Sequence, residues 1–474
     1  MMSGGMMSIN EAALALGARL IGVGADEATG RAAGSIRFDS VSTDSRTLAP
    51  GALFVALRGE RFDGHQFLTA VRERGAAGSM IDEAATPLVA AASRADKLPA
   101  IVVNDTRLGL GHLAAVWRAR FAIALIGVAG SNGKTTVKEM IAAILRAHFG
   151  AERTLATAGN LNNDIGLPLT LLRLRAQHAC AVIELGMNHP GETRELAAIA
   201  RPTVALVNNA QREHQEFMSS VADVAREHGA LFDALPSGGI AVINADDAHA
   251  DYWRGLNAAR VVRDFSIERS AAVTARHELG EAGSDIELNA PEGRVKFSLQ
   301  VPGLHNVRNA VAAAAAATAA GAGLDAVATG LAAFTAVRGR LQRKAGRHGA
   351  VVIDDTYNAN PDSVRAAIDV LARAAGRRVL VLGDMGEVGA QGPVFHAEIG
   401  RYAKERGVGR VLLAGESTRH VASAFGEGAE HFERFEDLLA AAVACDAPDA
   451  TVLVKGSRFM RMERAVAALT GETA

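Results

Sequence analysis

A glycine-rich stretch near the middle of the chain has the residue types needed to bind a nucleoside triphosphate. Residues 126–136 read IGVAGSNGKTT, with glycines spaced by three. Glycines let the backbone turn tightly and bring its N–H groups close to phosphates, and a helix that begins directly afterwards favours an anion at its N-terminus. Lys134 can reach the β- and γ-phosphates, and the Thr135 hydroxyl can bind Mg²⁺. The predicted ATP-binding residues here are Gly130, Ser131, Asn132, Gly133, Lys134, Thr135 and Thr136.

This stretch departs from the strict phosphate-loop pattern, whose first glycine would fall on Val128. The alternative is a glycine-rich turn between a strand and a helix that binds nothing. An apolar strand, three glycines, Lys-Thr-Thr and a helix follow one another here, which favours nucleotide binding.

An acid and a histidine follow two neighbouring apolar runs. Glu184 ends AVIELG, and His214 follows PTVALVNNA. Ligands of open α/β sheets bind beyond the carboxyl ends of the strands, so we expect both side chains to face the phosphate loop. We predict that Lys134, Glu184 and His214 are catalytic and that Thr135, Glu184 and His214 hold the metal. Imidazole is an unusual Mg²⁺ ligand, so His214 could act through a bound water. Taken alone, a solvated strand end and a loop histidine are the simpler interpretations.

A third polar segment, TAGNLNNDIG at residues 157–166, precedes an apolar helix. Asparagine amides both donate and accept hydrogen bonds and could bind a pyrophosphate or a sugar. The same composition suits a turn with a helix cap, and the residues alone leave both interpretations open. The predicted substrate-binding residues are Thr157, Asn160, Asn162 and Asn163.

The elements that must position these residues form three segments. Residues 1–104 mix short strands and helices, including the strands AGSMIDE and LPAIVVND on either side of an alanine-rich helix. Residues 105–337 alternate strands with helices, one of them from Lys134 to Phe149, before antiparallel strands between Ala275 and Val301 and a long helix. Residues 338–474 alternate again, as in a small doubly wound domain. We therefore predict an α/β protein of three domains with a mostly parallel central sheet.

Composition narrows the class of protein. Of the 474 residues, 49% are hydrophobic and only 4% aromatic, so the cores must consist mainly of Val, Leu, Ile and Ala. The net charge of −2, without a basic stripe, gives no support for a nucleic-acid partner. Two cysteines, Cys180 and Cys445, suit a reducing compartment. The N-terminus does not read as a secretory signal and no run of about 20 strongly apolar residues exists, so we expect a cytoplasmic protein without membrane insertion.

Motifs along the whole chain resemble those of the Mur ligases. In order they are GVAGSNGKTTVKEM, TAGNLNNDIGLPLTLL, VIELGMNHPGE, LHNVRNAVAA, DDTYNANPDSV, LGDMGEVG and VLVKGSRFMRME. The resemblance implies a UDP-sugar domain over 1–104, an ATP-binding ligase domain over 105–337 and a Rossmann-like domain for the incoming amine over 338–474. YNANP and GDMGE are similar to the segments of the member that joins D-alanyl-D-alanine to UDP-N-acetylmuramoyl-tripeptide, with ATP and Mg²⁺. A monomer is expected.

The resemblance also implies roles for single residues. The motif STDSR would contact the uridine side, together with FDGH from Phe62 to His65, although STDSR could be only a hydrogen-bonded turn. Residues of LHNVRN would lie near adenine, although the asparagines could only start a helix. Arg340 would swing onto the phosphates on domain closure, and Asp355 would contact the ribose. The residues concerned are Ser42, Thr43, Asp44, Ser45 and Arg46; His305, Asn306 and Asn309; Arg340 and Asp355; Tyr357, Asn358 and Asn360; and Lys455 with Arg458 for the dipeptide carboxylate.

One position departs from the family. Mur ligases often carry a carbamylated lysine that bridges two metals, and His228 stands where that lysine is expected. Histidine cannot form a carbamate. Either His228 helps the second metal site directly, or that site is held differently.

Two other functions fit part of the chain. A folylpolyglutamate synthase shares the expected chemistry, but it would lack YNANP and STDSR. An ATP-dependent switch or motor that does not ligate would leave the asparagine loop and the third domain unexplained.

Overall fold

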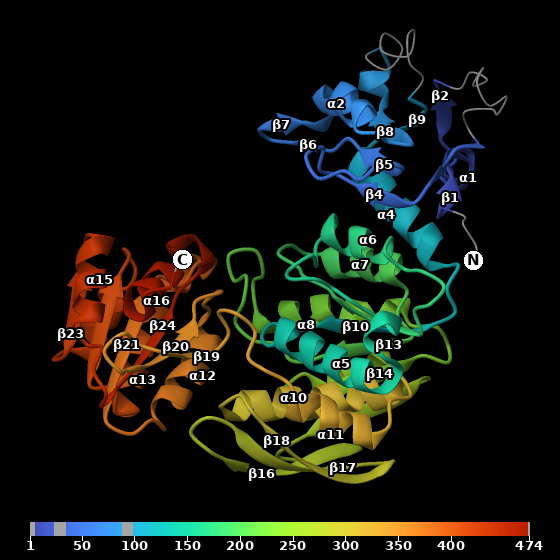
Figure 1. The fold of residues 1–474 in the computed structure, drawn as a ribbon. Coiled ribbons are helices and arrows are strands. Elements are labelled where there is room, and N and C mark those ends of the chain that lie inside the picture. Colours follow the sequence, from blue (N-terminus) through green and yellow to red (C-terminus); the bar gives the residue numbers. More distant parts are fainter. Residues whose placement is uncertain (1–4, 23–34, 88–97, 473–474) are drawn as a thin grey trace.

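Three α/β units follow one another along the chain, each on its own main sheet (Figure 1). The computed structural model describes residues 5–22, 35–87 and 98–472. The alanine-rich helix expected before LPAIVVND falls largely on residues 88–97, outside the described ranges. In Figure 1 the blue N-terminal unit lies above the green and yellow central unit, and the orange C-terminal unit lies beside the central one.

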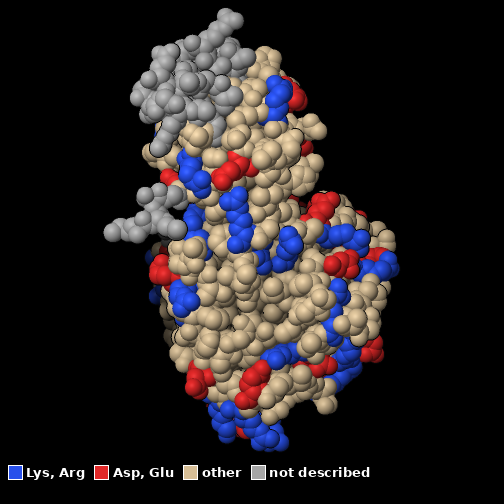
Figure 2. Space-filling view, turned by 90° about the vertical axis from the view of Figure 1, so that its right-hand side faces the viewer, with Lys and Arg blue, Asp and Glu red and all other residues tan. Residues whose placement is uncertain are grey.

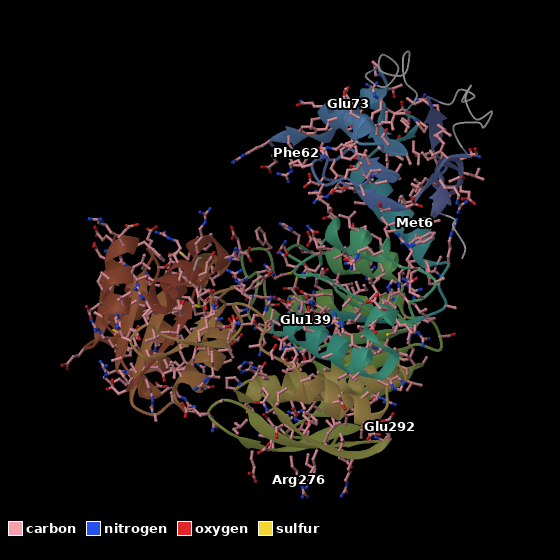
Figure 3. The ribbon with its side chains drawn as sticks, viewed as in Figure 1. Met6, Phe62, Glu73, Glu139, Arg276 and Glu292 are labelled. Atoms are coloured by element: carbon pink, nitrogen blue, oxygen red, sulfur yellow. The ribbon has the colours of Figure 1, made fainter. Side chains whose placement is uncertain are left out.

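The N-terminal unit is built on a five-stranded sheet that is parallel except at the edge strand β2. The strands in order are β2 (Arg19–Ile21), β9 (Ala100–Val103), β8 (Gly78–Asp82), β5 (Ala52–Val55) and β4 (Ser40–Ser42). The other elements are α1 (Ile9–Ala15), α2 (Leu68–Glu73) and the pairs β1 (Met7–Ser8) with β3 (Arg37–Phe38) and β6 (Arg58–Gly59) with β7 (Phe62–Asp63). Phe62 projects from the β6–β7 hairpin toward the side on which the C-terminal unit lies (Figure 3), and it is 58% exposed.

The central unit is built on a nine-stranded sheet whose first strands are parallel and whose last three are antiparallel. The strands in order are β11 (Thr154–Ala156), β12 (Cys180–Glu184), β10 (Ala124–Ala129), β13 (Val204–Val207), β14 (Ile240–Asn244), β15 (Val261–Ser266), β16 (Val273–Leu279), β17 (Ser284–Ala290) and β18 (Gly293–Leu299). Residues of β10 alternate between two cores, Ile126 and Val128 in one and Leu125 and Ala129 in the other. Both faces of the parallel strands are therefore covered, as a parallel sheet requires.

Helices cover the two faces of this sheet in distinct groups. On one face lie α5 (Lys134–Phe149), α10 (Leu304–Ala319) and α11 (Leu324–Ala332); on the other lie α4 (Thr106–Arg118), α6 (Gly166–Leu171), α7 (Glu192–Ala200) and α8 (Val221–Gly229). A short α9 (Ala250–Leu256) follows β14. Buried alanines from Ala312 to Ala317 let α10 approach α5 and the sheet closely.

The C-terminal unit is a doubly wound sheet with one antiparallel edge strand, β19. The strands in order are β19 (Gln342–Ala345), β20 (Val351–Asp355), β24 (Ala450–Lys455), β21 (Arg377–Gly383), β22 (Arg410–Ala414) and β23 (Ala429–Phe432). Helices α12 (Pro361–Leu371), α13 (Gly392–Glu405) and α14 (Arg419–Phe425) pack on one face, and α15 (Phe435–Val443) and α16 (Glu463–Thr470) on the other.

The expected fold is confirmed: three α/β domains with a mostly parallel central sheet. The helix from Lys134 to Phe149 and the antiparallel strands after Ala275 are also present, whereas the boundaries at 104/105 and 337/338 stay predictions. No helix in the described part of the chain is long and apolar enough to cross a membrane. Lys and Arg are interspersed with Asp and Glu on the face shown in Figure 2.

Candidate functional site

The phosphate loop leaves the carboxyl end of β10, which lies between β12 and β13 in the middle of the parallel strands. Gly130 and Gly133 have φ angles of 136° and 83°, a region that favours glycine. A Cβ atom on Gly133 would lie 2.6 Å from Asn309 Oδ1, so the side chain behind the loop also requires glycine there. Helix α5 begins at the next residue, Lys134. The loop therefore turns sharply and presents a helix N-terminus at the sheet edge.

Lys134 lies over its own loop. Its ammonium group donates to the carbonyl oxygens of Gly130 at 2.5 Å and Ser131 at 3.2 Å, and it lies 3.4 Å from Glu213 Oε2. The side chain is 15% exposed, so its charge is shielded little by water. This places a largely buried cation at the start of α5, beside the phosphate loop.

Glu184 is buried beside the start of α5, with an exposure of 2%. Its Oε1 accepts from Thr135 Oγ1 at 3.1 Å and from Asn162 Nδ2 at 2.7 Å, and its backbone N–H donates to Thr157 Oγ1. Its Oε2 has no hydrogen-bond partner among the described residues. A buried carboxylate oxygen without a donor, next to a threonine hydroxyl, is an arrangement that fits a hard divalent cation.

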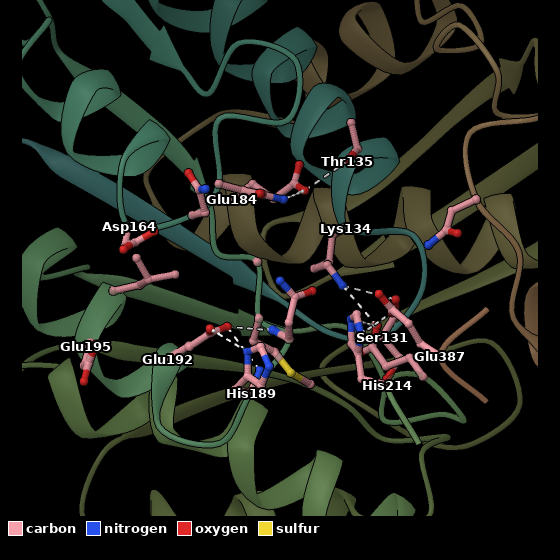
Figure 4. Close-up of a pocket in the computed structure, with 18 of the residues that line it drawn as sticks. Ser131, Lys134, Thr135, Asp164, Glu184, His189, Glu192, Glu195, His214 and Glu387 are labelled. Atoms are coloured by element: carbon pink, nitrogen blue, oxygen red, sulfur yellow. Dashed lines mark hydrogen bonds and ion pairs between the residues drawn. The ribbon is translucent and has the colours of Figure 1, made fainter. Parts of the chain in front are cut away.

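The side chain of His214 does not contact that of Glu184. It has a φ angle of 48°, and its Nδ1 lies 2.6 Å from Glu387 Oε2 of the C-terminal domain. Figure 4 shows Glu184 together with Thr135, whereas His214 lies with Ser131 and Glu387 on the other side of Lys134. Within residues 5–22, 35–87 and 98–472, no group of three or more His, Cys, Asp or Glu side chains could hold a metal ion. The metal ligation predicted for His214 therefore stays a prediction, and Glu184 with Thr135 is the arrangement that fits a cation.

Sequence reasoning missed Glu213, which is 7% exposed and points into the site. Its Oε1 lies 2.8 Å from His228 Nε2, and its Oε2 lies 3.4 Å from Lys134 and 3.7 Å from His214 Nε2. Burial raises the pKa of Glu213, but Lys134, His228 and His214 together outweigh burial and lower the pKa to about 2. His228 is fully buried on α8 and also lies 3.4 Å from Ser131 Oγ. Its ring thus contacts a carboxylate and the phosphate loop.

Arg212, the neighbour of Glu213, contacts the C-terminal domain. It forms charge-assisted hydrogen bonds of 2.6 Å to Asp362 on α12 and 2.7 Å to Glu398 on α13, and lies over the Phe395 ring. Residues 211–214 therefore link the phosphate loop to the C-terminal domain.

Two further contacts cross the same boundary. Arg340 donates to Thr135 Oγ1 at 2.9 Å and lies over the Tyr357 ring at 4.0 Å. The side chains of Asn132 and Asn360 exchange hydrogen bonds of 2.9 and 3.3 Å. Arg340, which is expected to reach the phosphates, therefore already lies beside the phosphate loop.

Two cavities meet at the phosphate loop. The larger, of about 970 Å³, lies between the central and C-terminal domains and is lined by Lys134, Thr135, Glu184 and His214, with Asn162, Asn163, Arg340, Tyr357, Asn358 and Asn360. The smaller, of about 310 Å³, lies on the other side of the loop and is lined by Thr136, His305, Asn306, Asn309, Arg340, Asp355 and Lys455. Asn132, Gly133 and Arg340 line both. A triphosphate chain could thus run from the smaller cavity past the loop into the larger one.

The smaller cavity gathers the residues expected near adenosine. Asn309 accepts from Asn208 at 3.1 Å and donates to Asn306, which in turn donates to the Pro302 carbonyl at the start of α10. Asn306 thus also has the helix-starting contact considered as the alternative. Burial lowers the pKa of His305 to about 4, so its ring is neutral at pH 7.

Several predicted residues lie elsewhere. Lys455 is 3% exposed and donates to Asp355 Oδ2 at 2.5 Å and to the Asn358 carbonyl, so it is not directed at the larger cavity. Arg458 lies outside both cavities and pairs with Glu463 at 3.2 Å. Thr157 is buried behind Glu184 and Asn160 is exposed outside both cavities, whereas Asn163 lines the larger cavity and accepts from the Gly166 N–H at the first residue of α6.

The motif STDSR forms a turn after β4, also outside both cavities. Asp44 accepts from the backbone N–H and the guanidinium group of Arg46, which lowers the pKa of Asp44 to about 2. Ser42 Oγ accepts from the Asp44 N–H at 3.1 Å. The hydrogen-bonded turn is thus present; Thr43 and Ser45 complete it.

Comparison with known proteins gives matches along most of the chain. Residues 128–317 match the Mur ligase middle domain, 339–458 the glutamate ligase domain of Mur ligases, and 37–118 the catalytic domain of the Mur ligase family. The chain is 43% identical over 438 residues to the UDP-N-acetylmuramoyl-tripeptide--D-alanyl-D-alanine ligase of Escherichia coli, covering 92% of this chain and 94% of that protein.

Solved structures of Mur ligases have the same fold as this chain. A crystal structure of MurF from Acinetobacter baumannii superposes with a TM-score of 0.87 at 31% identity, covering 98% of this chain and 99% of that one. MurF ligase from Thermotoga maritima in complex with ADP shares the fold, with a TM-score of 0.79 at 24% identity over 90% of this chain and 96% of that one.

Proposed function

The chain belongs to the Mur ligase family, and we propose on this basis that it joins D-alanyl-D-alanine to UDP-N-acetylmuramoyl-tripeptide. ATP and Mg²⁺ serve the reaction, and the product is a peptidoglycan precursor that ends in a pentapeptide. The observation that carries this proposal is the pair of cavities that meet at Lys134 and Arg340, together with 43% identity to a relative of that name.

The chemistry follows from the poor reactivity of a carboxylate as an acyl donor. Transfer of the γ-phosphoryl group of ATP to the tripeptide carboxylate gives an acyl phosphate with a good leaving group. The amine of the dipeptide then attacks the acyl carbon, and the tetrahedral intermediate collapses to an amide and inorganic phosphate. We assign Lys134 and Arg340 to neutralise the transferring phosphoryl group, because both lie at the junction of the cavities.

A divalent cation would be held by Thr135 and Glu184 and would balance the charge of the phosphates. The carboxylate of Glu184 also accepts from Asn162, which fixes its orientation. The contacts of Arg212, Arg340 and Asn360 hold the C-terminal domain beside the phosphate loop, and this proximity supports exclusion of water from the acyl phosphate.

The remaining assignments follow the same reasoning. The STDSR turn from Ser42 to Arg46 is proposed for the uridine side, the smaller cavity for adenosine, and Tyr357, Asn358 and Asn360 for the acceptor side of the larger cavity. Cys180 and Cys445 are both free thiols, which supports a reducing cytoplasm.

The test measures phosphate release from ATP and Mg²⁺ with UDP-N-acetylmuramoyl-tripeptide, with and without D-alanyl-D-alanine. Release that requires both substrates, with a pentapeptide product by mass spectrometry, is expected. Release that ignores both substrates would contradict the proposal and favour a nucleotide switch. Neither a folate substrate nor glutamate should replace the two substrates.

A further inference from the structure

A buried carboxylate and a buried histidine lie at the reacting end of the phosphate loop without a role in the reaction as described. Glu213 and His228 are 7% and 0% exposed, and their side chains lie 2.8 Å apart. Removing two ionisable side chains from water carries a penalty that the pair's own attraction often fails to offset. Such a pair is therefore weak evidence for stability, and its position beside Lys134 calls for a functional reason.

The contacts form a chain that ends at Lys134. His228 holds one oxygen of Glu213, and the other oxygen lies 3.4 Å from the Lys134 ammonium group. With the carbonyl oxygens of Gly130 and Ser131, Glu213 completes a set of three acceptors around an ammonium group that has three donors. The position of the ammonium group is thereby fixed.

We propose that Glu213 is a positioning residue of the ligation reaction, held by His228, which directs the Lys134 ammonium group toward the transferring phosphoryl group. This inference rests on the proposed function. It also answers the question raised by His228, which stands where a carbamylated lysine is expected. In this chain a carboxylate from the neighbouring loop lies beside that position, and the histidine holds it.

The proposal predicts that removing the Glu213 charge lowers turnover without weakening nucleotide binding. Without the Glu213 charge, Lys134 loses one of its three acceptors and can leave the phosphoryl position, so kcat falls. A carboxylate near the phosphates also repels them, so its removal does not weaken nucleotide binding. A residue with a purely structural role would lower kcat, nucleotide affinity and the melting temperature together.

The experiment compares Glu213→Gln with the wild type in the full-length protein. The measurements are kcat with saturating substrates, the Kd of a non-hydrolysable ATP analogue, the Mg²⁺ dependence of turnover and the melting temperature. Glu216→Gln is the matched control, since Glu216 is an exposed acid on the same loop. We expect Glu213→Gln to lower kcat by about 30- to 300-fold, in the range found when one preorganised group is removed. The Kd of the analogue should not rise.

Variants of His228 test whether it acts through Glu213. His228→Ala should resemble Glu213→Gln, and the double variant should be no worse than Glu213→Gln alone, because two residues that act as a unit are not additive. His228→Gln retains an N–H donor near the place of Nε2 and should keep most of the activity.

Three results would overturn the proposal. They are a kcat of Glu213→Gln within about threefold of the wild type, a parallel loss of kcat and nucleotide affinity, and a turnover that excess Mg²⁺ restores. The last result would make Glu213 a metal ligand. A wild-type protein without substrate-dependent phosphate release would instead contradict the proposed function, and the analogue-binding comparison would still test the contact between Glu213 and Lys134.

Discussion

Substitution of Arg212 by alanine should release the C-terminal domain from the central one. The guanidinium group binds Asp362 at 2.6 Å and Glu398 at 2.7 Å, and both acids would lose this partner. Removing one partner of a desolvated, hydrogen-bonded charge pair costs about 2–5 kcal/mol. Because Arg212 and the two acids are 22–25% exposed, we expect a value near the lower end, about 2–3 kcal/mol. At 1.4 kcal/mol per factor of ten, the ratio of docked to undocked domains falls by about 30- to 150-fold.

The assay is fluorescence transfer between dyes on cysteines introduced at Lys296 and Glu433, which are 77% and 81% exposed in the central and C-terminal domains. Arg212→Ala should broaden the distance distribution without nucleotide and lower kcat/KM. The matched control is Arg365→Ala, because Arg365 also pairs with Glu398, at 2.9 Å, but both residues belong to the C-terminal domain. Equal effects of the two substitutions, or an unchanged distance distribution for Arg212→Ala, would refute the reasoning.

Three other predictions concern single side chains. Lys134→Ala should lower kcat by at least about 10²-fold, as loss of a preorganised charge does, and steady-state kinetics within a few-fold of the wild type would contradict its role. Arg340→Lys keeps the charge but not the planar group over Tyr357, so it should lower kcat about tenfold or more; equal rates would show that charge alone suffices. The pKa of His305 falls from its usual 6.5 to about 4 on folding, because the half-buried ring is desolvated. As pH falls from about 6.5 to 4, the unfolded chain takes up this proton first, so stability should decrease by up to about 3 kcal/mol, and His305→Gln should flatten this change in urea unfolding.

The parts of the site that follow a strand could be predicted from the sequence. The phosphate loop and Glu184 each come at the end of a short apolar run, and the ends of neighbouring parallel strands share one edge of the sheet. The fold class could be predicted for the same reason, since strand and helix periodicities alternate along the chain. The residues expected near adenine, His305, Asn306 and Asn309, could be predicted only from the resemblance to the Mur ligases.

The contacts of the 211–214 loop could not be predicted. The left-handed backbone conformation at His214 affects the directions of the side chains in this loop. Some of their partners lie in a domain more than a hundred residues further along the chain, so the sequence does not show which residues will be in contact. In the sequence, Glu213 therefore could not be distinguished from any other acidic residue in a loop. Lys455 was predicted to bind a carboxylate, and it does contact one, that of Asp355 in its own domain. A strand-end lysine does not reveal in sequence whether its partner is a ligand or a neighbouring strand.

Four consecutive residues of the 211–214 loop each contact a different part of the chain. The Gln211 side-chain oxygen accepts from Asn132 Nδ2, Arg212 binds α12 and α13, Glu213 binds His228, and His214 lies against Glu387. Each contact depends on the direction in which its Cα–Cβ bond leaves the backbone. An insertion or deletion of one residue would rotate all four side chains away from their partners at once. A substitution therefore removes the contacts of one residue, whereas a change of length would remove the contacts of all four, although loops generally tolerate insertions and deletions.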